Sequence, residues 1–191
     1  WQLVQSGGDT PPSVLVLERE SQPGYHTTGR SAALFEEHYG PAQVQALTRA
    51  SRAFYDAPPV GFADAPILTP RGVLYVGTAE QKELIDQIYA AAIVHAPQSQ
   101  RLNAEQLKAM VPCLRDDVIV DGFLDQGARD IDVNGLLQGY IRGLRQRGGD
   151  LWGDAQVQAI TRIDELWHIE LSKGQSVRAK VIVNAAGAWV D

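Results

Sequence analysis

An acidic residue directly after an apolar run is the first position where the sequence suggests a binding site. Residues 14–17 read Val-Leu-Val-Leu and are followed by Glu18. In a dinucleotide-binding βαβ unit, an acidic side chain at the end of the second strand accepts hydrogen bonds from ribose hydroxyls, about 20 residues after a glycine fingerprint. Only 17 residues precede Glu18, and they contain no such fingerprint, so it would lie upstream of Trp1. On spacing alone, Glu18 is equally a nucleotide ligand or the charged end of an ordinary strand.

Two further segments combine small residues with hydrogen-bonding groups. Residues 27–31 read Thr-Thr-Gly-Arg-Ser and precede Ala32 and Ala33, where we expect a helix to begin. Hydroxyls and backbone N–H groups in such a turn can hold pyrophosphate oxygens or the edge of a polar ring, and the alternative is an ordinary N-capped helix. Residues 184–187 read Asn-Ala-Ala-Gly, and their small side chains allow the backbone to approach either a ligand or a packed helix.

The remaining polar residues indicate no metal site and no nucleophilic catalysis. His26, His95 and His168 have no cysteine or acid at metal-ligand spacing, so we interpret them as structural or surface residues. Cys113 is the single cysteine and has no base beside it, so an inert thiol is expected. Arg30 could pair with a phosphate or with an acid of the core.

Composition and charge exclude several classes of protein. Of the 191 residues, 45% are hydrophobic and 21% are charged, which is typical of a globular protein, and the net charge is −6. There is no basic run interleaved with aromatic residues, which argues against nucleic acid as a partner, and no apolar run long enough to span a bilayer. A single cysteine rules out an intrachain disulfide and fits a reducing compartment, so we expect a cytoplasmic protein.

The hydrophobic periodicity predicts alternating helices and strands. The predicted helices are 41–55, 78–93, 104–110 and 133–147. The predicted strands are 14–17, 118–124, 156–163, 166–171 and 176–183, with a hairpin of 67–69 and 73–76 around Pro70-Arg71-Gly72. Strands near both ends flank helices, as in a parallel α/β sheet, and the middle, about 34–130, looks like a second lobe inserted into that sheet.

Both ends of the chain read as interrupted elements. Residues 1–4 look like the last turn of a helix that stops at Gly7-Gly8, and residues 185–189 look like the opening of another helix. We therefore expect the sequence to be a piece of a longer protein.

Taken together, the motifs carry a resemblance to a known family. The first is V-L-V-L-E-R-E followed by P-G-Y-H-T-T-G-R-S-A-A, and the second, much later, is V-I-V-N-A-A-G-A-W. The chain resembles the FAD-dependent D-amino acid oxidase and dehydrogenase superfamily, which includes glycine and sarcosine oxidases, and within it the branch of the bacterial D-arginine dehydrogenases. The similarity runs through nearly the whole chain, including residues 49–54, 130–132 and 139–140.

This resemblance implies an α/β fold with an incomplete, Rossmann-like FAD/NAD(P)-binding domain and an inserted α+β substrate lobe. Residues 1–34 would be the first part of the flavin domain, 35–130 the substrate or cap lobe, and 131–191 the return part of the flavin domain. The resemblance also implies FAD contacts by Glu18, Arg19, Thr27, Thr28, Gly29, Arg30, Ser31, Ala32, Ala33, Leu34, Val157, Ala185, Ala186 and Gly187.

The implied roles differ along the chain. Glu18 would bind the FAD ribose and Arg19 would lie near the adenosine, while residues 27–33 would follow the pyrophosphate and the isoalloxazine. The backbone of Val157 would meet the adenine. Residues 185–187 would pass close to the ribityl and phosphate groups.

The resemblance implies a reaction as well. A hydride would leave the Cα of a neutral amine substrate for the flavin, and water would convert the imine to a 2-oxo acid and ammonia. Tyr39 matches a tyrosine on the substrate side, and its alternative is a packed surface aromatic. Leu34 stands where the D-arginine dehydrogenases have a substrate-facing histidine, and His38 follows four residues later. Because Val73 and Leu74 are apolar where an acid would meet a guanidinium, an apolar or small amino acid suits this site at least as well as a basic one.

Two other hypotheses remain open at this stage. The chain could be a sarcosine- or glycine-type secondary amine oxidase. It could also be a truncated fragment that binds no flavin or that only associates with a partner protein. For a D-amino acid oxidoreductase or a secondary amine oxidase, the electron acceptor could be oxygen or a quinone.

Overall fold

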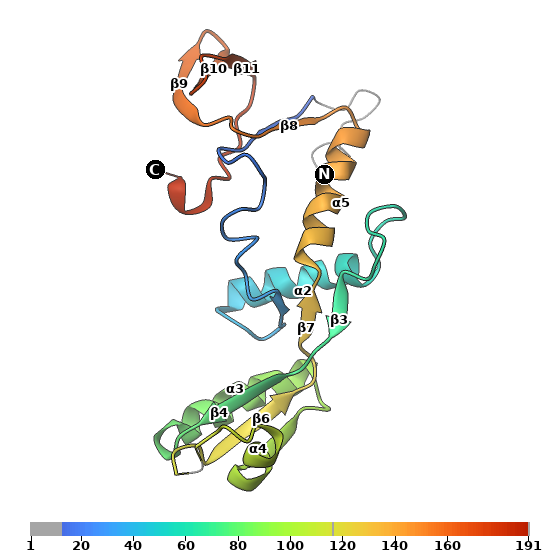
Figure 1. Cartoon of the computed structure of the whole chain (residues 1–191), viewed down its shortest axis with the longest axis vertical. Coiled ribbons are helices and arrows are strands. Elements are labelled where there is room, and N and C mark those ends of the chain that lie inside the picture. The colour runs from blue at the N-terminus through green and yellow to red at the C-terminus, as the bar shows by residue number, and fades with distance from the viewer. Residues whose placement is uncertain (1–12, 116, 191) are drawn as a thin grey trace. The chain divides into compact units, whose positions relative to one another are not determined.

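The computed structural model describes residues 13–115 and 117–190, which form two compact units (Figure 1). One unit contains the chain up to Arg30 together with the chain from Tyr140 onward, and the other contains Ser31–Gly139. The helix end predicted at residues 1–4 lies outside the described residues. Among the described residues, no helix has the length and apolar character required to cross a bilayer.

In the first unit, two parallel strands lie in register. Strand β1 (Leu15–Leu17) pairs with β8 (Asp150–Trp152), so that Leu15 faces Asp150 and Leu17 faces Trp152. Strand β8 follows helix α5 (Val133–Gln146), and the two are joined by glycines, of which Gly148 has a positive φ of 75°. At Gly149, a Cβ atom would collide with the side chain of Leu144, so the tight end of the helix requires glycine here.

A three-stranded antiparallel meander completes this unit. It consists of β9 (Val157–Ile163), β10 (Leu166–Leu171) and β11 (Ser176–Ala179), with β10 in the middle. The predicted turn at Asp164-Glu165 is confirmed, and Asp164 has a positive φ of 54°. Ala155, Ile169 and Leu171 form its buried core.

The predicted strand 176–183 is wrong in its second half, because β11 ends at Ala179. Val181 and Val183 are 74% and 68% exposed, and residues 181–186 pair with no strand in the part of the chain that the structure describes. An apolar run becomes a strand only where a neighbouring strand takes up its backbone hydrogen bonds. The following short 3₁₀ helix η2 (Gly187–Trp189) agrees with the helical start expected there.

The second unit contains two small antiparallel sheets. The first has the order β2 (Leu34–Phe35), β7 (Arg129–Ile131) and β3 (Leu68–Pro70), and helix α2 (Ala42–Asp56) follows β2 along the chain. The second has the order β4 (Val73–Gly77), β6 (Asp121–Asp125) and β5 (Gln100–Asn103).

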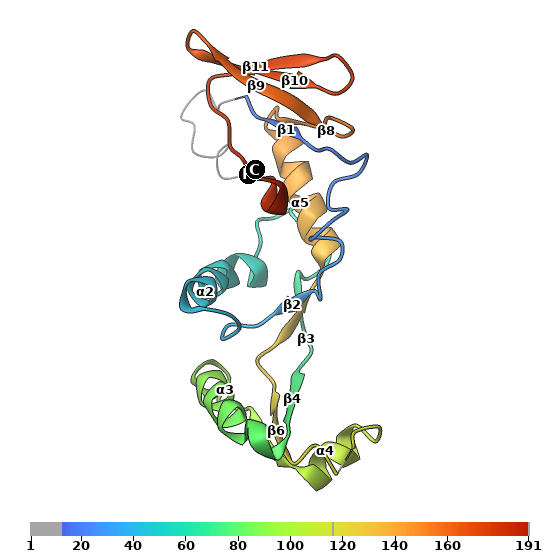
Figure 2. The same cartoon turned by 90° about the vertical axis from the view of Figure 1, so that its left-hand side faces the viewer.

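Helices cover both faces of this second sheet (Figure 2). The 3₁₀ turn η1 (Ala79–Gln81) leads into α3 (Lys82–His95), whose Ile85 would lie 2.7 Å from a Cβ atom at Gly77. Helix α4 (Ala104–Met110) places Leu107 against Gly122 on the opposite face. The predicted cap of α4 is confirmed, since Asn103 Oδ1 accepts a hydrogen bond from Gln106 N.

The predicted hairpin of residues 67–69 and 73–76 is wrong. Strand β3 pairs with β7, and β4 pairs with β6, so the chain at Pro70-Arg71-Gly72 passes from one sheet to the other instead of turning back. Gly72 permits this step with a φ of 91°. Strands β6 and β7, which follow more than forty positions later, supply the pairing that local turn residues suggested for β3 and β4.

Candidate functional site

Glu18 lies at the carboxyl end of the parallel strand β1. Its backbone N–H donates to Trp152 O at 2.9 Å, which extends the β1–β8 pairing by one residue. Its Oε1 accepts a hydrogen bond from Glu20 N at 3.0 Å, which orients the half-buried carboxylate in the loop beyond the strand. Ligands of open α/β sheets bind outside the carboxyl ends of the strands, so this carboxylate has the position and the acceptor atoms that a ribose requires.

The structure brings the loop after β1 against the end of the second motif. The Arg19 guanidinium lies 5.1 Å above the ring of Trp189, and the His26 ring is 4.7 Å from the same indole. Arg19 also donates to Glu20 Oε1 at 2.9 Å. The hydrogen bond from His26, with the one from Arg19, lowers the pKa of the Glu20 carboxyl. The two sequence motifs of the predicted nucleotide site therefore meet in one unit.

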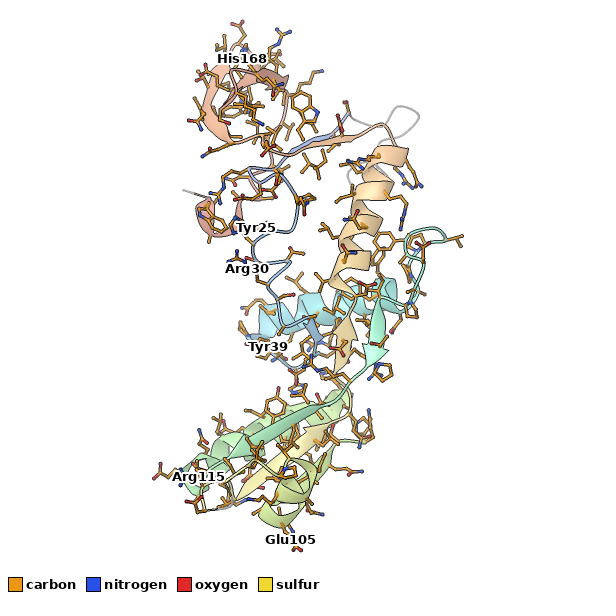
Figure 3. All side chains as sticks on the ribbon, in the orientation of Figure 1. Tyr25, Arg30, Tyr39, Glu105, Arg115 and His168 are labelled. Carbon is orange, nitrogen blue, oxygen red and sulfur yellow. The ribbon has the colours of Figure 1, made fainter. Side chains whose placement is uncertain are left out.

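The predicted phosphate-binding segment is a compact turn whose residues are exposed. Gly29 N donates to Gly24 O at 2.7 Å, and Arg30 N donates to His26 O at 3.1 Å. A Cβ atom at Gly29 would collide with Gly24 O, so this turn requires a glycine. Thr27, Thr28, Gly29, Arg30, Ser31 and Ala32 are all exposed (the loop can be followed from Tyr25 to Arg30 in Figure 3).

The helix predicted to begin at residues 31–33 does not form. Ala33 has a positive φ of 54°, and its carbonyl accepts a hydrogen bond from Ile131 N at 2.7 Å, so the chain enters β2 directly. A left-handed alanine costs about 1–2 kcal/mol and persists only where its surroundings impose it. Leu34 then pairs with Asp130 in the sheet and is half-buried.

The remaining predicted FAD contacts lie in the first unit. Val157 begins β9, whose second edge has no strand partner among the described residues, and the chain before it is held at Glu18 because Ala155 N donates to Glu18 O at 2.8 Å. Ala185, Ala186 and Gly187 are exposed, and Asn184 Oδ1 accepts a hydrogen bond from Ala186 N at 3.1 Å. Val157 thus lies on an edge strand of its sheet, and residues 185–187 are exposed to solvent.

These features fit FAD in the first unit. An oriented carboxylate lies at the end of a parallel strand, and a turn that admits no Cβ atom follows it in the same loop. The late run of small, exposed residues connects to Trp189, which contacts that loop. When bound, FAD would supply a redox-active ring that accepts a hydride.

Tyr39 belongs to the second unit and is 67% exposed (Figure 3). It lies between β2 and α2, where Gly40 has a φ of 80°. Gln45 Nε2 from α2 donates to His38 O at 3.0 Å and to Gly40 O at 2.8 Å, so the backbone on both sides of Tyr39 is held. The phenol is therefore presented to solvent from an anchored loop, which is compatible with contact to a small substrate.

Sequence reasoning missed a cluster of buried charged residues next to this loop. Glu36 and His38 face Asp125 at the end of β6, and their side chains are 2%, 5% and 1% exposed. Burial alone would raise the pKa of the Glu36 carboxyl, but the neighbouring His38 imidazole and the hydrogen bond from Tyr75 outweigh burial and lower that pKa. No local signal connects residues so far apart in the chain, although the alternation Glu36-x-His38 next to a short strand was visible.

Comparisons with known proteins agree with this description. The model of the family described as FAD dependent oxidoreductase matches residues 1–191. Mitochondrial dimethylglycine dehydrogenase from Homo sapiens is 33% identical over 96 residues, which are 50% of this chain and 11% of that protein.

Solved structures show the same fold. Glycine oxidase from Geobacillus kaustophilus has a TM-score of 0.76 at 18% identity, covering 93% of this chain and 50% of that one. The L-proline dehydrogenase from P. horikoshii has a TM-score of 0.73 at 16% identity, covering 99% and 49%. The chain thus spans about half the length of these enzymes. The α/β fold of an FAD-binding oxidoreductase and the FAD cofactor, both expected from the sequence, are confirmed, and the chain belongs to the FAD-dependent oxidoreductase family.

Proposed function

We propose that this protein oxidises the Cα–N bond of a D-amino acid. The observation that carries this proposal is the oriented Glu18 carboxylate at the end of β1, in a unit where both nucleotide-site motifs meet. FAD would accept the hydride from the substrate Cα, and the imine would be hydrolysed to a 2-oxo acid and ammonia.

In this proposal, residues of this chain bind FAD and orient it. The Glu18 carboxylate accepts hydrogen bonds from the ribose hydroxyls, and Arg19 lies near the adenosine. Residues 27–33 and Leu34 follow the pyrophosphate and the isoalloxazine, Val157 meets the adenine through its backbone, and residues 185–187 approach the ribityl chain. The domain limits 1–34, 35–130 and 131–191 stay predictions on the same basis.

Tyr39 is the proposed substrate-side residue. Its phenol is exposed, and the loop on both sides of it is held by Gln45, so it can contact a substrate without a large loss of loop entropy. The guanidinium of Arg71 pairs with Asp130 at 2.9 Å, and Val73 and Leu74 follow it, so an apolar or small D-amino acid is favoured over D-arginine. The cytoplasm stays the expected compartment because of the single cysteine.

A glycine- or sarcosine-type amine is the second candidate substrate. It is favoured by the names of the relatives, since dimethylglycine dehydrogenase and glycine oxidase both act on small amines, as their names state. Assaying the intact protein with D-alanine, glycine, sarcosine and dimethylglycine, with oxygen or a quinone as acceptor, distinguishes the two.

Cofactor binding by the chain itself is tested by absorbance. The chain is mixed with FAD, separated from the excess by gel filtration, and its visible spectrum is recorded. We expect a retained flavin band that Glu18→Ala weakens at least tenfold, whereas Glu165→Ala, an exposed charge in the β9–β10 turn of the same unit, leaves it unchanged. If folded chain keeps no flavin, it is a fragment that binds none, and the assignment of Glu18 fails for this chain.

A further inference from the structure

Three titratable side chains meet in the interior of the second unit without a role in the proposed flavin chemistry. His38 Nε2 lies 3.1 Å from Glu36 Oε1, and His38 Nδ1 lies 3.8 Å from Asp125 Oδ2. One ligand atom from each of the three residues can be chosen so that all of these atoms lie within 4.8 Å of one another. We call Glu36, His38 and Asp125 the buried triad.

Hydrogen bonding does not account for this arrangement. The His38 Nε2 atom is near Glu36 Oε1 but is not aligned for a hydrogen bond with it, and both His38 Nε2 and Glu36 Oε2 are buried without a hydrogen-bond partner. The 3.8 Å between His38 Nδ1 and Asp125 is too long for a hydrogen bond. Buried polar atoms left unpaired cost free energy, so a native structure normally supplies a partner for them.

The distance between His38 Nε2 and Glu36 Oε1 matches that of two ligands that share one ion. Zinc lies 2.0–2.2 Å from imidazole nitrogen and carboxylate oxygen, so two tetrahedral ligands are separated by about 3.3 Å. The observed 3.1 Å between His38 and Glu36 is close to this value, and their lack of alignment is expected when both atoms point at a third centre.

Neighbouring donors hold the carboxylates of the buried triad in place. Tyr75 Oη donates to Glu36 Oε1 at 2.5 Å. Asp125 Oδ1 accepts hydrogen bonds from Ser99 Oγ at 3.1 Å and from Gly127 N at 2.7 Å. Partners of this kind orient first ligands at metal sites and fix which oxygen faces the ion.

The charge of the buried triad also favours a cation. The buried carboxylates of Glu36 and Asp125 both face the imidazole of His38, so a cation there would lie between two acids. We propose that Glu36, His38 and Asp125 bind one divalent transition-metal ion of the zinc class, with water completing the coordination.

Metal binding is tested on the whole chain after treatment with a chelator. Zn²⁺ is titrated in competition with a chromophoric chelator, and bound metal is counted after gel filtration. We expect one tightly bound Zn²⁺ per chain, and Co²⁺ substituted for it should show the visible bands of a four-coordinate nitrogen–oxygen site. Glu36→Gln, which keeps an acceptor for Tyr75, and His38→Asn should each weaken binding at least tenfold.

The matched control is His95→Asn, which removes an exposed histidine at the end of α3 in the same unit and should leave the affinity unchanged. Circular dichroism verifies that each variant is folded. Folded wild-type chain that binds no Zn²⁺ would overturn the proposal and leave a site that holds only protons. Equal binding by wild type, Glu36→Gln and His38→Asn would overturn it as well, because the ion would then lie elsewhere.

Discussion

Removing the Tyr75 hydroxyl should lower the local stability of the β4–β6 sheet far more than removing the Tyr89 hydroxyl. Both rings contact Phe123, with centroids 4.6 and 5.3 Å away, so replacement by phenylalanine leaves their packing in place. The hydroxyls differ in their acceptors: Tyr75 donates to the buried Glu36 carboxylate at 2.5 Å, and Tyr89 donates to the neutral Ser99 carbonyl at 3.3 Å. The two substitutions therefore form a matched pair that isolates the charge of the acceptor.

The magnitudes follow from the two kinds of hydrogen bond. A bond to a charged group contributes about 1.5–3 kcal/mol, and a neutral one contributes about 0.5–1.5 kcal/mol. Tyr75→Phe should therefore accelerate hydrogen exchange of β4 and β6 amides by about 13- to 160-fold, and Tyr89→Phe by about 2- to 13-fold. Exchange measured by mass spectrometry on peptides from these strands reports this unit separately from the other.

Equal effects of the two substitutions would refute this reasoning. The double variant Tyr75→Phe/Glu36→Gln provides a second check, because a neutral amide that loses its donor costs less than a buried carboxylate that loses it, so the combined loss should be smaller than the sum of the two single losses. If the double variant is instead as unstable as the sum of its parts, the Tyr75–Glu36 bond does not carry the difference.

Two further expectations concern separate parts of the chain. Arg101 donates to Asp121 Oδ1 at 3.0 Å and lowers the pKa of that carboxyl. The ion pair therefore stabilises the folded chain above pH 3.8, the pKa of Asp121 in the unfolded chain. This stabilisation is lost as the pH falls through the lower pKa that Asp121 has in the folded chain. Asp121→Asn should thus lower the free energy of unfolding by about 0.5–1 kcal/mol at pH 7, and urea titrations at successively lower pH should find that the difference from the wild type shrinks below pH 3.8. In the loop after β1, Gly29→Ala would place a Cβ atom against Gly24 O. This variant should retain less FAD after gel filtration, while its circular dichroism spectrum stays unchanged. Undiminished FAD retention would show that the turn has no part in binding.

Features determined by neighbouring residues could be predicted from the sequence. Helices α2 and α4 and the β9–β10 turn lie where periodicity and capping placed them, because their signals lie within a few positions of one another. Strand partners could not be predicted in the same way. Strands β3 and β4 look like a hairpin locally, and only the distant β6 and β7 decide their pairing.

The candidate sites show the same difference between local signals and long-range pairing. Glu18 could be predicted as a candidate because a strand and its terminal acid are adjacent in the sequence. The turn at 27–31 and the small residues 184–187 could also be singled out locally, and the resemblance added Val157 and the FAD role of these segments. The buried triad could not be found, because Asp125 reaches His38 only after β6 has paired with β4. The left-handed conformation of Ala33 could not be predicted from the sequence either, because alanine normally favours the helix that was expected there.

The passage of the chain from one sheet to the other at Gly72 has a consequence for the order of folding. The pairs Leu68–Ile131 and Val73–Asp125 close a long loop that contains α3, β5 and α4. Closing a long loop costs chain entropy before the contacts between its ends form, so the pairing of β3 and β4 with β7 and β6 should be slow. The two helices within the loop should form earlier. Tyr75 and Asp125 lie on these two paired strands, so the charged interior around Glu36 can assemble only after β4 and β6 have paired.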